Sequence, residues 1–573
     1  MTAVKNYEKW ISSPCLDESL KKELLEIRGN EKEIEERFSV SLEFGTGGLR
    51  GIIRAGTNGI NLHTVRWATQ GLSNLIIKTG ADAMKKGVAI AYDSRLYSAE
   101  FAAESARVLA ANGIKAYLFP ELAPTPLLSF AIRELSAIAG IVITASHNPA
   151  KYNGYKAYWS DGGQLPPEEA DVVYAEMGRV DIFDDVKLVD FSEGLKSGLI
   201  EYIKPEVNEA YYNAILALSI NKDAVKNSDI KVVYTPFHGA GNIPVRAVLG
   251  KIGLKNLTVV KEQELPDPAF STVKSPNPEE SEGFTIARKY AAEIDADIII
   301  GTDPDSDRVG LLLKNKNCEY EILNGNQIGI ILVNYILQGR KKNNAIPENG
   351  VVVKTIVTTN MIYELAKEYG ISVVNVLTGF KFIGEQIKMF EETGKHAYLF
   401  GFEESYGYLS GTHARDKDAV NAAMLICEAA AFYKEQGKTL KEVLDEIYEK
   451  YGYYNEHQIS ITHEGLSGVE KIKKMMSDLR EKLPTEFAGV KNIESRDYQA
   501  LTITDMNTMK KAPLDFVKSN VLSFLLSDGT LLTIRPSGTE PKIKAYIMTK
   551  GKTPEETAEN VEKYSAAVKE LLN

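Results

Sequence analysis

Cysteine is scarce in this sequence, and no long apolar run occurs. The 573 residues contain three cysteines, far apart and without a CxxC pair, which argues against a zinc or disulfide framework and fits a reducing compartment. No stretch of 18 apolar residues is present, so we expect no membrane partner. The opening segment MTAVKNYEKW has no apolar signal region, and we expect a cytoplasmic protein.

A surplus of basic residues is also missing. The formal net charge is −11, which argues against a nucleic-acid partner, because a phosphate backbone needs a basic face. Small anionic substrates remain possible, since a few converging Arg and Lys side chains can reverse the local potential.

Three common catalytic motifs are absent. The GKT triplets at positions 437 and 551 lack the glycine that a Walker A loop has five residues earlier, and neither GxSxG nor GxGxxG occurs. These absences argue against NTPase, esterase and dinucleotide-dependent activities.

Strand and helix patterns alternate through most of the chain. Residues 88–92 predict a buried strand, residues 98–111 a helix and residues 114–119 a further strand, which makes a βαβ unit. The same pattern recurs over 231–261 and 350–376. It predicts three α/β domains built on parallel strands, and one large sheet is the alternative.

The last hundred residues have a different pattern. A hairpin is predicted over 524–534 with its turn at Asp528-Gly529, followed by a helix over 554–571, and together they indicate a smaller α+β domain. We therefore expect four domains: 1–205, 206–322, 323–450 and 451–573.

The loop Thr144-Ala-Ser-His-Asn-Pro149 follows an apolar run over 138–143. Because ligands bind beyond the carboxyl ends of strands in α/β sheets, Ser146 is expected at a cleft. Its small neighbours are expected to leave the hydroxyl accessible, with His147 able to polarise it. The alternative is a turn in which Ser and Asn only bond to the backbone.

The loop GTDPDSDR at 301–308 places three carboxylates at alternate positions, those of Asp303, Asp305 and Asp307. Such oxygens can converge on one hard cation. An EF-hand is excluded, since Arg308 and Lys314 stand where Gly and Glu are needed. Too few ligands for calcium favour magnesium, and an acidic solvated turn is the alternative.

Two further loops carry polar groups. In GFEESYG, at 401–407, Glu and Ser side chains could bind vicinal hydroxyls, and His413-Ala-Arg-Asp-Lys417 could bind phosphate, although an exposed helix start would also explain those charges. In RPSGTEPK, at 535–542, Arg535, two hydroxyls and backbone N–H groups could cradle an oxyanion, and a β-turn is the alternative.

In combination and in this order, the four loops resemble those of the α-D-phosphohexomutase family, which includes phosphoglucomutases, phosphomannomutases and phosphopentomutases. The segment EFGTGGLRG at 43–51 also resembles the family's N-terminal substrate segment. The resemblance runs from about residue 43 to 544. It implies three similar mixed-sheet α/β domains and a C-terminal α+β domain around a central cleft.

The resemblance also implies a role for each matching residue. Ser146 would carry a phosphoryl group and, with the three aspartates, hold Mg²⁺. The remaining catalytic residues would be Arg50, His147, Lys156, Arg308 and Lys417. The substrate-binding residues would be Thr378, Gly379, Glu403, Ser405, His413, Arg415, Arg535, Ser537, Gly538 and Thr539. Lys542 and Lys544 stand where many members have an arginine, and lysine lacks the bidentate guanidinium fork.

The implied reaction interconverts glucose 1-phosphate and glucose 6-phosphate through a phosphoserine and glucose 1,6-bisphosphate, which also acts as activator. Mannose or pentose phosphates are alternative substrates on the same mechanism. A non-catalytic regulator that binds sugar bisphosphate and a metal-dependent phosphatase are alternatives of other classes.

Overall fold

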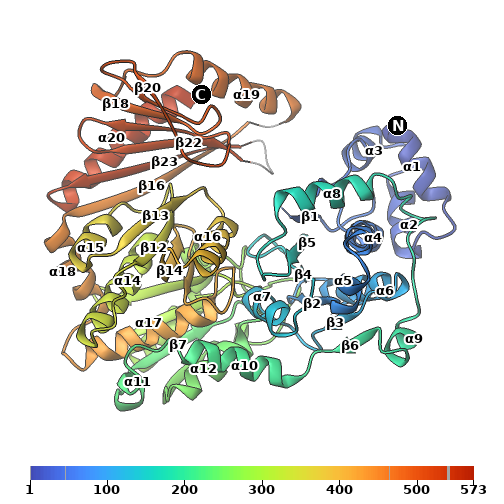
Figure 1. Cartoon of the computed structure of the whole chain (residues 1–573), viewed down its shortest axis with the longest axis horizontal. Coiled ribbons are helices and arrows are strands. Elements are labelled where there is room, and N and C mark those ends of the chain that lie inside the picture. Colours follow the sequence, from blue (N-terminus) through green and yellow to red (C-terminus); the bar gives the residue numbers. More distant parts are fainter. Residues whose placement is uncertain (1, 46, 464, 538–541, 573) are drawn as a thin grey trace. The chain divides into compact units, whose positions relative to one another are not determined.

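The computed structural model describes residues 2–45, 47–463, 465–537 and 542–572 (Figure 1). The chain divides into two compact units. Unit 1 comprises Met1–Gly325, Ile383–Phe400 and Ser405–Thr439, and unit 2 comprises Asn326–Phe382, Gly401–Glu404 and Leu440–Asn573. Among the described residues, no helix combines the length and apolar character that crossing a membrane requires.

Unit 1 begins with three short helices and a six-stranded mixed sheet of order β1-β5-β4-β2-β3-β6. The central strands β2, β3 and β4 run parallel, whereas β5 is antiparallel to both β4 and β1. The elements of this part are α1 (Ala3–Ser12), α2 (Glu18–Glu26), α3 (Glu31–Phe38), β1 (Gly48–Ile52), α4 (Leu62–Thr79), α5 (Ala81–Lys86), β2 (Val88–Tyr92), α6 (Ser98–Ala111), β3 (Ala116–Leu118), α7 (Thr125–Glu134), β4 (Ala139–Ile143), β5 (Tyr152–Trp159), α8 (Pro167–Met177), α9 (Phe191–Lys196) and β6 (Ile200–Tyr202).

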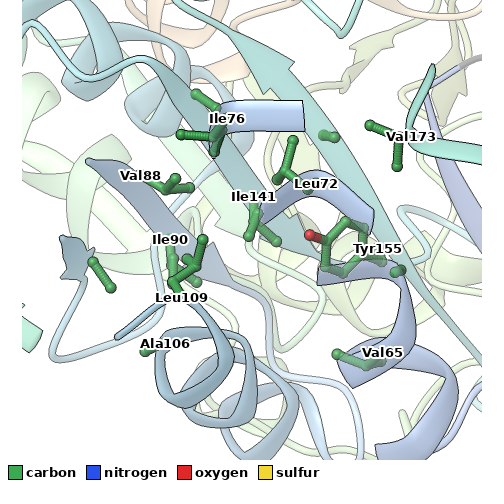
Figure 2. Close-up of a cluster of buried hydrophobic side chains, with 14 of the residues drawn as sticks. Val65, Leu72, Ile76, Val88, Ile90, Ala106, Leu109, Ile141, Tyr155 and Val173 are labelled. Atoms are coloured by element: carbon green, nitrogen blue, oxygen red, sulfur yellow. The ribbon is translucent and has the colours of Figure 1, made fainter. Parts of the chain in front are cut away.

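A hydrophobic core lies between this sheet and its helices (Figure 2). Val88 and Ile90 of β2, Leu72 of α4 and Leu109 of α6 are fully buried in it. Helix α6 ends at Ala111, and Gly113, two residues later, has a φ of +72° that lets the chain turn back into β3. Burial of this kind, at about 25 cal/mol per Å² of apolar surface, fixes the strand ends that carry the loops.

A second mixed sheet of unit 1 has the order β11-β10-β9-β7-β8. Strands β7, β8 and β9 are parallel, and β10 is antiparallel to β9. The elements are α10 (Pro205–Leu216), α11 (Ala224–Asn227), β7 (Lys231–Thr235), α12 (Asn242–Lys251), β8 (Asn256–Val259), η1 (Lys261–Gln263), η2 (Ser281–Phe284), α13 (Thr285–Ile294), β9 (Ile298–Thr302), β10 (Val309–Lys314) and β11 (Tyr320–Ile322). Because these strands form a sheet of their own, the alternative of one large sheet is wrong.

Residues 326–451 belong partly to unit 1 and partly to unit 2. In unit 2, β12 pairs with β13 in parallel. The elements are α14 (Gly325–Lys342), β12 (Gly350–Thr355), α15 (Ile362–Tyr369), β13 (Ser372–Val376), α16 (Phe380–Thr393), β14 (Ala397–Glu403), β15 (Gly407–Ser410), α17 (Ala419–Lys434) and α18 (Leu440–Tyr451). Strand β14 continues through Glu403, so the first three residues of the predicted loop 401–407 belong to a strand.

The C-terminal part of unit 2 is an antiparallel sheet of order β16-β23-β22-β21-β18-β19-β20, with β17 paired to β18. The predicted hairpin is present as β21 and β22, with Gly529 at φ +85° in its turn. The elements are β16 (Tyr453–Thr462), α19 (Gly465–Glu481), β17 (Glu486–Phe487), β18 (Val490–Asp497), β19 (Thr502–Asp505), β20 (Lys511–Pro513), β21 (Leu522–Leu526), β22 (Leu531–Pro536), β23 (Lys542–Gly551) and α20 (Pro554–Leu572).

Candidate active site

Ser146 lies in the loop that follows β4, where the sequence predicts it, but its surroundings differ from the prediction. The residue is only 3% exposed and adopts a φ of +50°, so the expectation of an accessible hydroxyl is wrong. Its Oγ donates a hydrogen bond to Asp303 Oδ2 at 2.8 Å and lies 3.2 Å from His147 Nδ1. The side chain therefore does more than bond to the neighbouring backbone. It contacts the segment 303–308 between β9 and β10, which carries the three aspartates and is called the acid loop below.

A buried arginine holds the backbone of this loop through hydrogen bonds. Arg95, whose side chain is fully buried, donates to four backbone carbonyls around the serine, those of Ser146, Asn148, Pro149 and Tyr152. Four carbonyls held by one guanidinium fix the backbone of the loop in a single conformation.

Asp93 also helps to hold the serine loop and Arg95 in place. Its carboxylate accepts hydrogen bonds from Thr144 Oγ1 at 2.6 Å and Ser98 Oγ at 2.8 Å, and it lies 3.3 Å from the Arg95 guanidinium. Neither Asp93 nor Arg95 is among the residues predicted from the sequence. The signal was present, because Asp93-Ser-Arg95 directly follows an apolar strand pattern, as the other polar loops do.

The three aspartates of the acid loop lie between β9 and β10 and are essentially unexposed. One oxygen from each lies within 4.8 Å of the other two. Strand β9 continues to Thr302, so the loop itself starts at Asp303. Burial excludes the alternative of an acidic solvated turn.

Two lysines from other elements balance this charge. Lys156 of β5 lies 2.8 Å from Asp305 Oδ2 and 3.6 Å from Asp307 Oδ2. Lys417 lies 3.1 Å from Asp307 Oδ2 and 3.2 Å from Asp416 Oδ1. The three carboxylates of the loop thus lie with two ammonium groups in a buried volume, and Asp416 adds a fourth buried carboxylate beside Lys417.

The environment perturbs the titration of these groups. Burial, followed by the charges of Asp305 and Asp307, raises the pKa of Asp303 well above its usual range. Burial also opposes ionisation of Asp305, but the Lys156 ammonium outweighs it and lowers the pKa of that carboxyl. Burial would lower the pKa of Lys156, yet the two carboxylates raise it, so the lysine is cationic at neutral pH.

The acid loop fits a hard divalent cation. Asp305 Oδ1 and Asp307 Oδ1 are buried, and neither has a hydrogen-bond partner among the described residues. Together with Asp303 and the Ser146 hydroxyl they offer only oxygen donors, the ligand type that Mg²⁺ prefers. Unpartnered buried carboxylate oxygens are costly without a counter-charge, and a cation supplies one.

The remaining predicted catalytic residues lie nearby in unit 1. Arg50 of β1 donates to Asn148 Oδ1 at 3.4 Å, beside the serine loop. Arg308 ends the acid loop and forms an ion pair with Glu279 at 2.5 Å. Burial, with the charges of Arg308 and Arg50, lowers the pKa of His147 well below its usual range. Its imidazole is therefore neutral at pH 7.

His413 and Arg415 have other partners. His413 Nε2 lies 2.7 Å from Asp418 Oδ2, and the Arg415 guanidinium contacts Glu391 and the Thr412 carbonyl. Both side chains are nearly unexposed, so the alternative of an exposed helix start is wrong. Among the described residues of the predicted basic group, Lys417 reaches the acid loop, through its ion pair with Asp307.

Unit 2 brings together a second set of predicted residues. Glu403 Oε1 accepts a hydrogen bond from the backbone N–H of Gly379 at 2.8 Å, and Arg535 of β22 donates to the hydroxyl of Thr378. A carboxylate, a hydroxyl and a guanidinium thus lie around the turn after β13. These groups match what a phosphorylated sugar offers, namely hydroxyls and an anion.

The other predicted binding residues are placed as follows. Ser405 belongs to unit 1, in the turn between β14 and β15, and is half-buried. The Ser537 N–H donates to the Lys542 carbonyl at 2.7 Å. Gly538 and Thr539 lie outside the described residues, as does Thr46 of the N-terminal segment.

Family models match four successive segments of the chain. They are the phosphoglucomutase/phosphomannomutase alpha/beta/alpha domain I at 41–181, domain II at 209–316, domain III at 324–451 and the C-terminal domain at 473–567. Three α/β/α domains and a C-terminal domain confirm the predicted fold class.

Relatives match over nearly the whole length. A phosphoglucomutase of Staphylococcus saprophyticus is 36% identical over 538 residues, which cover 94% of this chain and 95% of the relative. A putative phosphomannomutase of Thermus thermophilus has a similar structure, with a TM-score of 0.68 and 22% identity, covering 92% of this chain and 99% of that one. The N-acetylphosphoglucosamine mutase of Aspergillus fumigatus, solved with GlcNAc-6P and magnesium, has a TM-score of 0.52 at 13% identity and covers 93% and 97% of the two chains.

Proposed function

The chain belongs to the phosphoglucomutase/phosphomannomutase family, and from that premise we propose that it interconverts α-D-glucose 1-phosphate and glucose 6-phosphate, with Ser146 as phosphoryl carrier. One observation carries the proposal. The Ser146 hydroxyl, held in a fixed loop, donates to Asp303 within a buried group of three carboxylates and two lysines.

The transfer exchanges one bond for another. The bond between phosphorus and Ser146 Oγ breaks while a hydroxyl oxygen of the sugar monophosphate bonds to the same phosphorus, giving glucose 1,6-bisphosphate and a free serine. The second phosphate of that intermediate then returns to Ser146 in the reverse step. Small amounts of glucose 1,6-bisphosphate would activate the enzyme by phosphorylating Ser146.

The protein's own groups supply positioning and charge. Phosphoryl transfer depends on in-line placement and on stabilising the equatorial oxygens, more than on covalent chemistry. Lys156 and Lys417, which lie beside the acid loop, would neutralise those oxygens. Arg50 of β1 and Arg308 at the end of the acid loop would add positive charge. The neutral His147 imidazole, 3.2 Å from the serine oxygen, would accept the hydroxyl proton of Ser146 when phosphate returns.

Asp303, Asp305, Asp307 and the Ser146 oxygen would hold the magnesium ion, which supplies Lewis-acid polarisation of the phosphoryl oxygens when it is bound. This assignment rests on the oxygen-only donor set and on the two buried carboxylate oxygens without partners among the described residues.

The groups of unit 2 would bind the sugar and its nonreacting phosphate. Glu403 would accept hydrogen bonds from hydroxyls, and Arg535 with Thr378 would hold the phosphate. Ser537, Gly538 and Thr539 would also contact the substrate. Ser405, His413 and Arg415, which belong to unit 1, would bind the substrate as well.

A substrate panel tests the proposal. Purified enzyme is supplied with glucose, mannose, ribose and N-acetylglucosamine 1-phosphates, with and without added glucose 1,6-bisphosphate, and product and inorganic phosphate are both quantified. We expect glucose 6-phosphate to form fastest and to depend on the bisphosphate. Faster turnover of mannose or ribose phosphate would reassign the substrate, inorganic phosphate as the main product would indicate a phosphatase, and no turnover with tight bisphosphate binding would indicate a regulator.

A further inference from the structure

Unit 2 contains a cavity of about 250 Å³ whose lining includes a lysine that the proposed mutase reaction does not use. Lys354 is on β12, in register with Asn375 of β13, and is only 1% exposed. Tyr363, Arg496 and Tyr498 line the same cavity. The cavity therefore combines one buried amine, one guanidinium and aromatic walls.

The hydrogen bonds of Lys354 match a neutral amine. Its Nζ donates to the carbonyls of Thr358 at 2.8 Å and Thr355 at 3.2 Å, the two acceptors that the described residues provide. An ammonium has three N–H donors, whereas a neutral amine has two and a lone pair. The centroid of the Tyr363 ring lies 5.5 Å from Nζ, a contact that would favour the cation.

The surroundings of Lys354 determine whether its side chain is a neutral amine or an ammonium. Burial lowers the pKa of Lys354 to about 7; the nearby charge of Arg496 acts in the same direction, while Glu456 and Glu404 oppose it. An ordinary lysine is neutral in about one molecule in a thousand near pH 7.4. A lysine desolvated in this way is a far better nucleophile, as in enzymes that use a buried lysine amine.

We propose that the Lys354 amine reacts reversibly with carbon dioxide to form a carbamate, which the Arg496 guanidinium holds in the cavity. The nitrogen lone pair forms the C–N bond, one C=O electron pair moves to oxygen, and one N–H proton leaves to water. The nitrogen keeps one hydrogen for the shorter bond to Thr358.

The size and chemistry of the cavity favour this electrophile. Carbon dioxide is small and uncharged, so it reaches a 1% exposed amine without carrying charge into the protein, and it needs no leaving group. The carbamate product is anionic, and the Arg496 guanidinium is a cation that already lines the cavity. Arg496 donates to Glu494 through Nε, and its other N–H donors are on Nη1 and Nη2. The Tyr363 hydroxyl accepts a hydrogen bond from Asn375, which leaves its own proton to donate.

Trapping experiments test the proposal on the full chain. The protein is equilibrated with isotopically labelled bicarbonate near pH 7.5, carbamates are ethylated with a trialkyloxonium salt, and the peptides are mapped by mass spectrometry. We expect labelled adduct at Lys354 and at least tenfold less at Lys367, an exposed lysine of the same unit that serves as the internal control. Absence of adduct at Lys354 under saturating carbon dioxide would overturn the proposal.

Two variants separate chemistry from folding. Lys354→Met should abolish the adduct. Arg496→Gln keeps the Lys354 amine but loses a charge-assisted hydrogen bond to the carbamate, so the fraction of Lys354 that carries the adduct at limiting carbon dioxide should fall about tenfold. Circular dichroism checks that each variant is folded. Unchanged occupancy in Arg496→Gln would contradict the role of the guanidinium. Neither readout depends on mutase activity.

Discussion

At the scale of single residues, unit 1 buries three carboxylates close to one serine. Bringing like charges within 4.8 Å in a protein interior is unfavourable without compensation. Lys156 and Lys417 supply part of that compensation, and a divalent cation would supply more. Such clusters of buried charge are typical of phosphoryl-transfer sites, because the charges that stabilise the transition state must be in place before the reaction begins.

We expect Ser146→Ala to remove nearly all mutase turnover while leaving unit 1 folded, because the Oγ atom is the proposed phosphoryl carrier. The change deletes one hydrogen bond to Asp303, so its effect on the free energy of unfolding should be about 1 kcal/mol. Coupled assays measure the rate. Ser105→Ala is the matched control and should keep activity, because this buried serine of α6 bonds, among the described residues, within its helix and to Thr69. Near-normal turnover in Ser146→Ala would remove the carrier assignment.

Asp305→Asn should weaken magnesium binding, since it removes one carboxylate from the oxygen donor set and leaves the volume almost unchanged. The readout is the melting temperature with and without Mg²⁺. A ligand at a hundred times its dissociation constant stabilises a protein by about 2.7 kcal/mol, and this gain should be largely lost in the variant. Asp267→Asn, at an exposed turn, is the control and should keep the gain. An equal magnesium-dependent shift in both variants would mean that the acid loop is not the metal site.

At the scale of elements, the loops of the site depend on close packing between neighbouring strand ends. The loop after β7 lies directly against the acid loop. A Cβ atom on Gly239 would lie 2.5 Å from Pro304 Cα and 2.8 Å from the Pro304 carbonyl oxygen, so only glycine fits without displacing the backbone.

Gly239→Ala should therefore move Pro304 and with it the aspartates on either side. We expect a loss of about 1–3 kcal/mol in the free energy of unfolding, as for other overpacked positions, and weaker magnesium binding. The matched control is Gly250→Ala on α12, where an added Cβ meets nothing within 4 Å and should be neutral or stabilising by about 0.5–1 kcal/mol. Denaturant titrations measure both. Equal stability of the two variants would contradict this packing.

Much of this element-level arrangement can be read from the sequence, and the exceptions have physical causes. The helix predicted over 98–111 has the bounds of α6, because its apolar periodicity and the following glycine agree. Strands β9 and β14 extend to Thr302 and Glu403, inside the predicted polar loops 301–308 and 401–407, since pairing with neighbouring strands overrides the polar residue types. The burial of Ser146 and the role of Arg95 depend on contacts between distant segments, which no local pattern encodes.

At the scale of the whole molecule, each unit carries its own half of the proposed chemistry: carboxylates, lysines and the serine in unit 1, and Arg535, Thr378 and Glu403 in unit 2. The stability of unit 1 includes a pH-dependent contribution away from the site. His63 of α4 is 2% exposed, lies among the rings of Trp10 and Phe183, and has a buried Nε2 with no partner among the described residues.

Burial, assisted by the charge of Arg66, lowers the pKa of His63 to about 4. The unfolded chain, with a pKa near 6.5, binds the proton more readily, so the stabilisation is complete above pH 6.5 and is lost as the pH falls toward 4. The loss amounts to at most about 3 kcal/mol. Urea titrations at several pH values should show that His63→Phe has a shallower decline than the wild type over this window. Parallel declines would show that another group is responsible.

The central claim is that phosphate passes through Ser146, and phosphoryl transfer from radiolabelled glucose 1,6-bisphosphate tests it most directly. The protein is incubated with the labelled bisphosphate, separated from free sugar, and divided into two portions. Digestion of the first should show the label on the peptide that contains Ser146. Unlabelled glucose 1-phosphate added to the second should remove the label from the protein and return it in sugar phosphates. Label found at another residue, or released mainly as inorganic phosphate, would contradict the account.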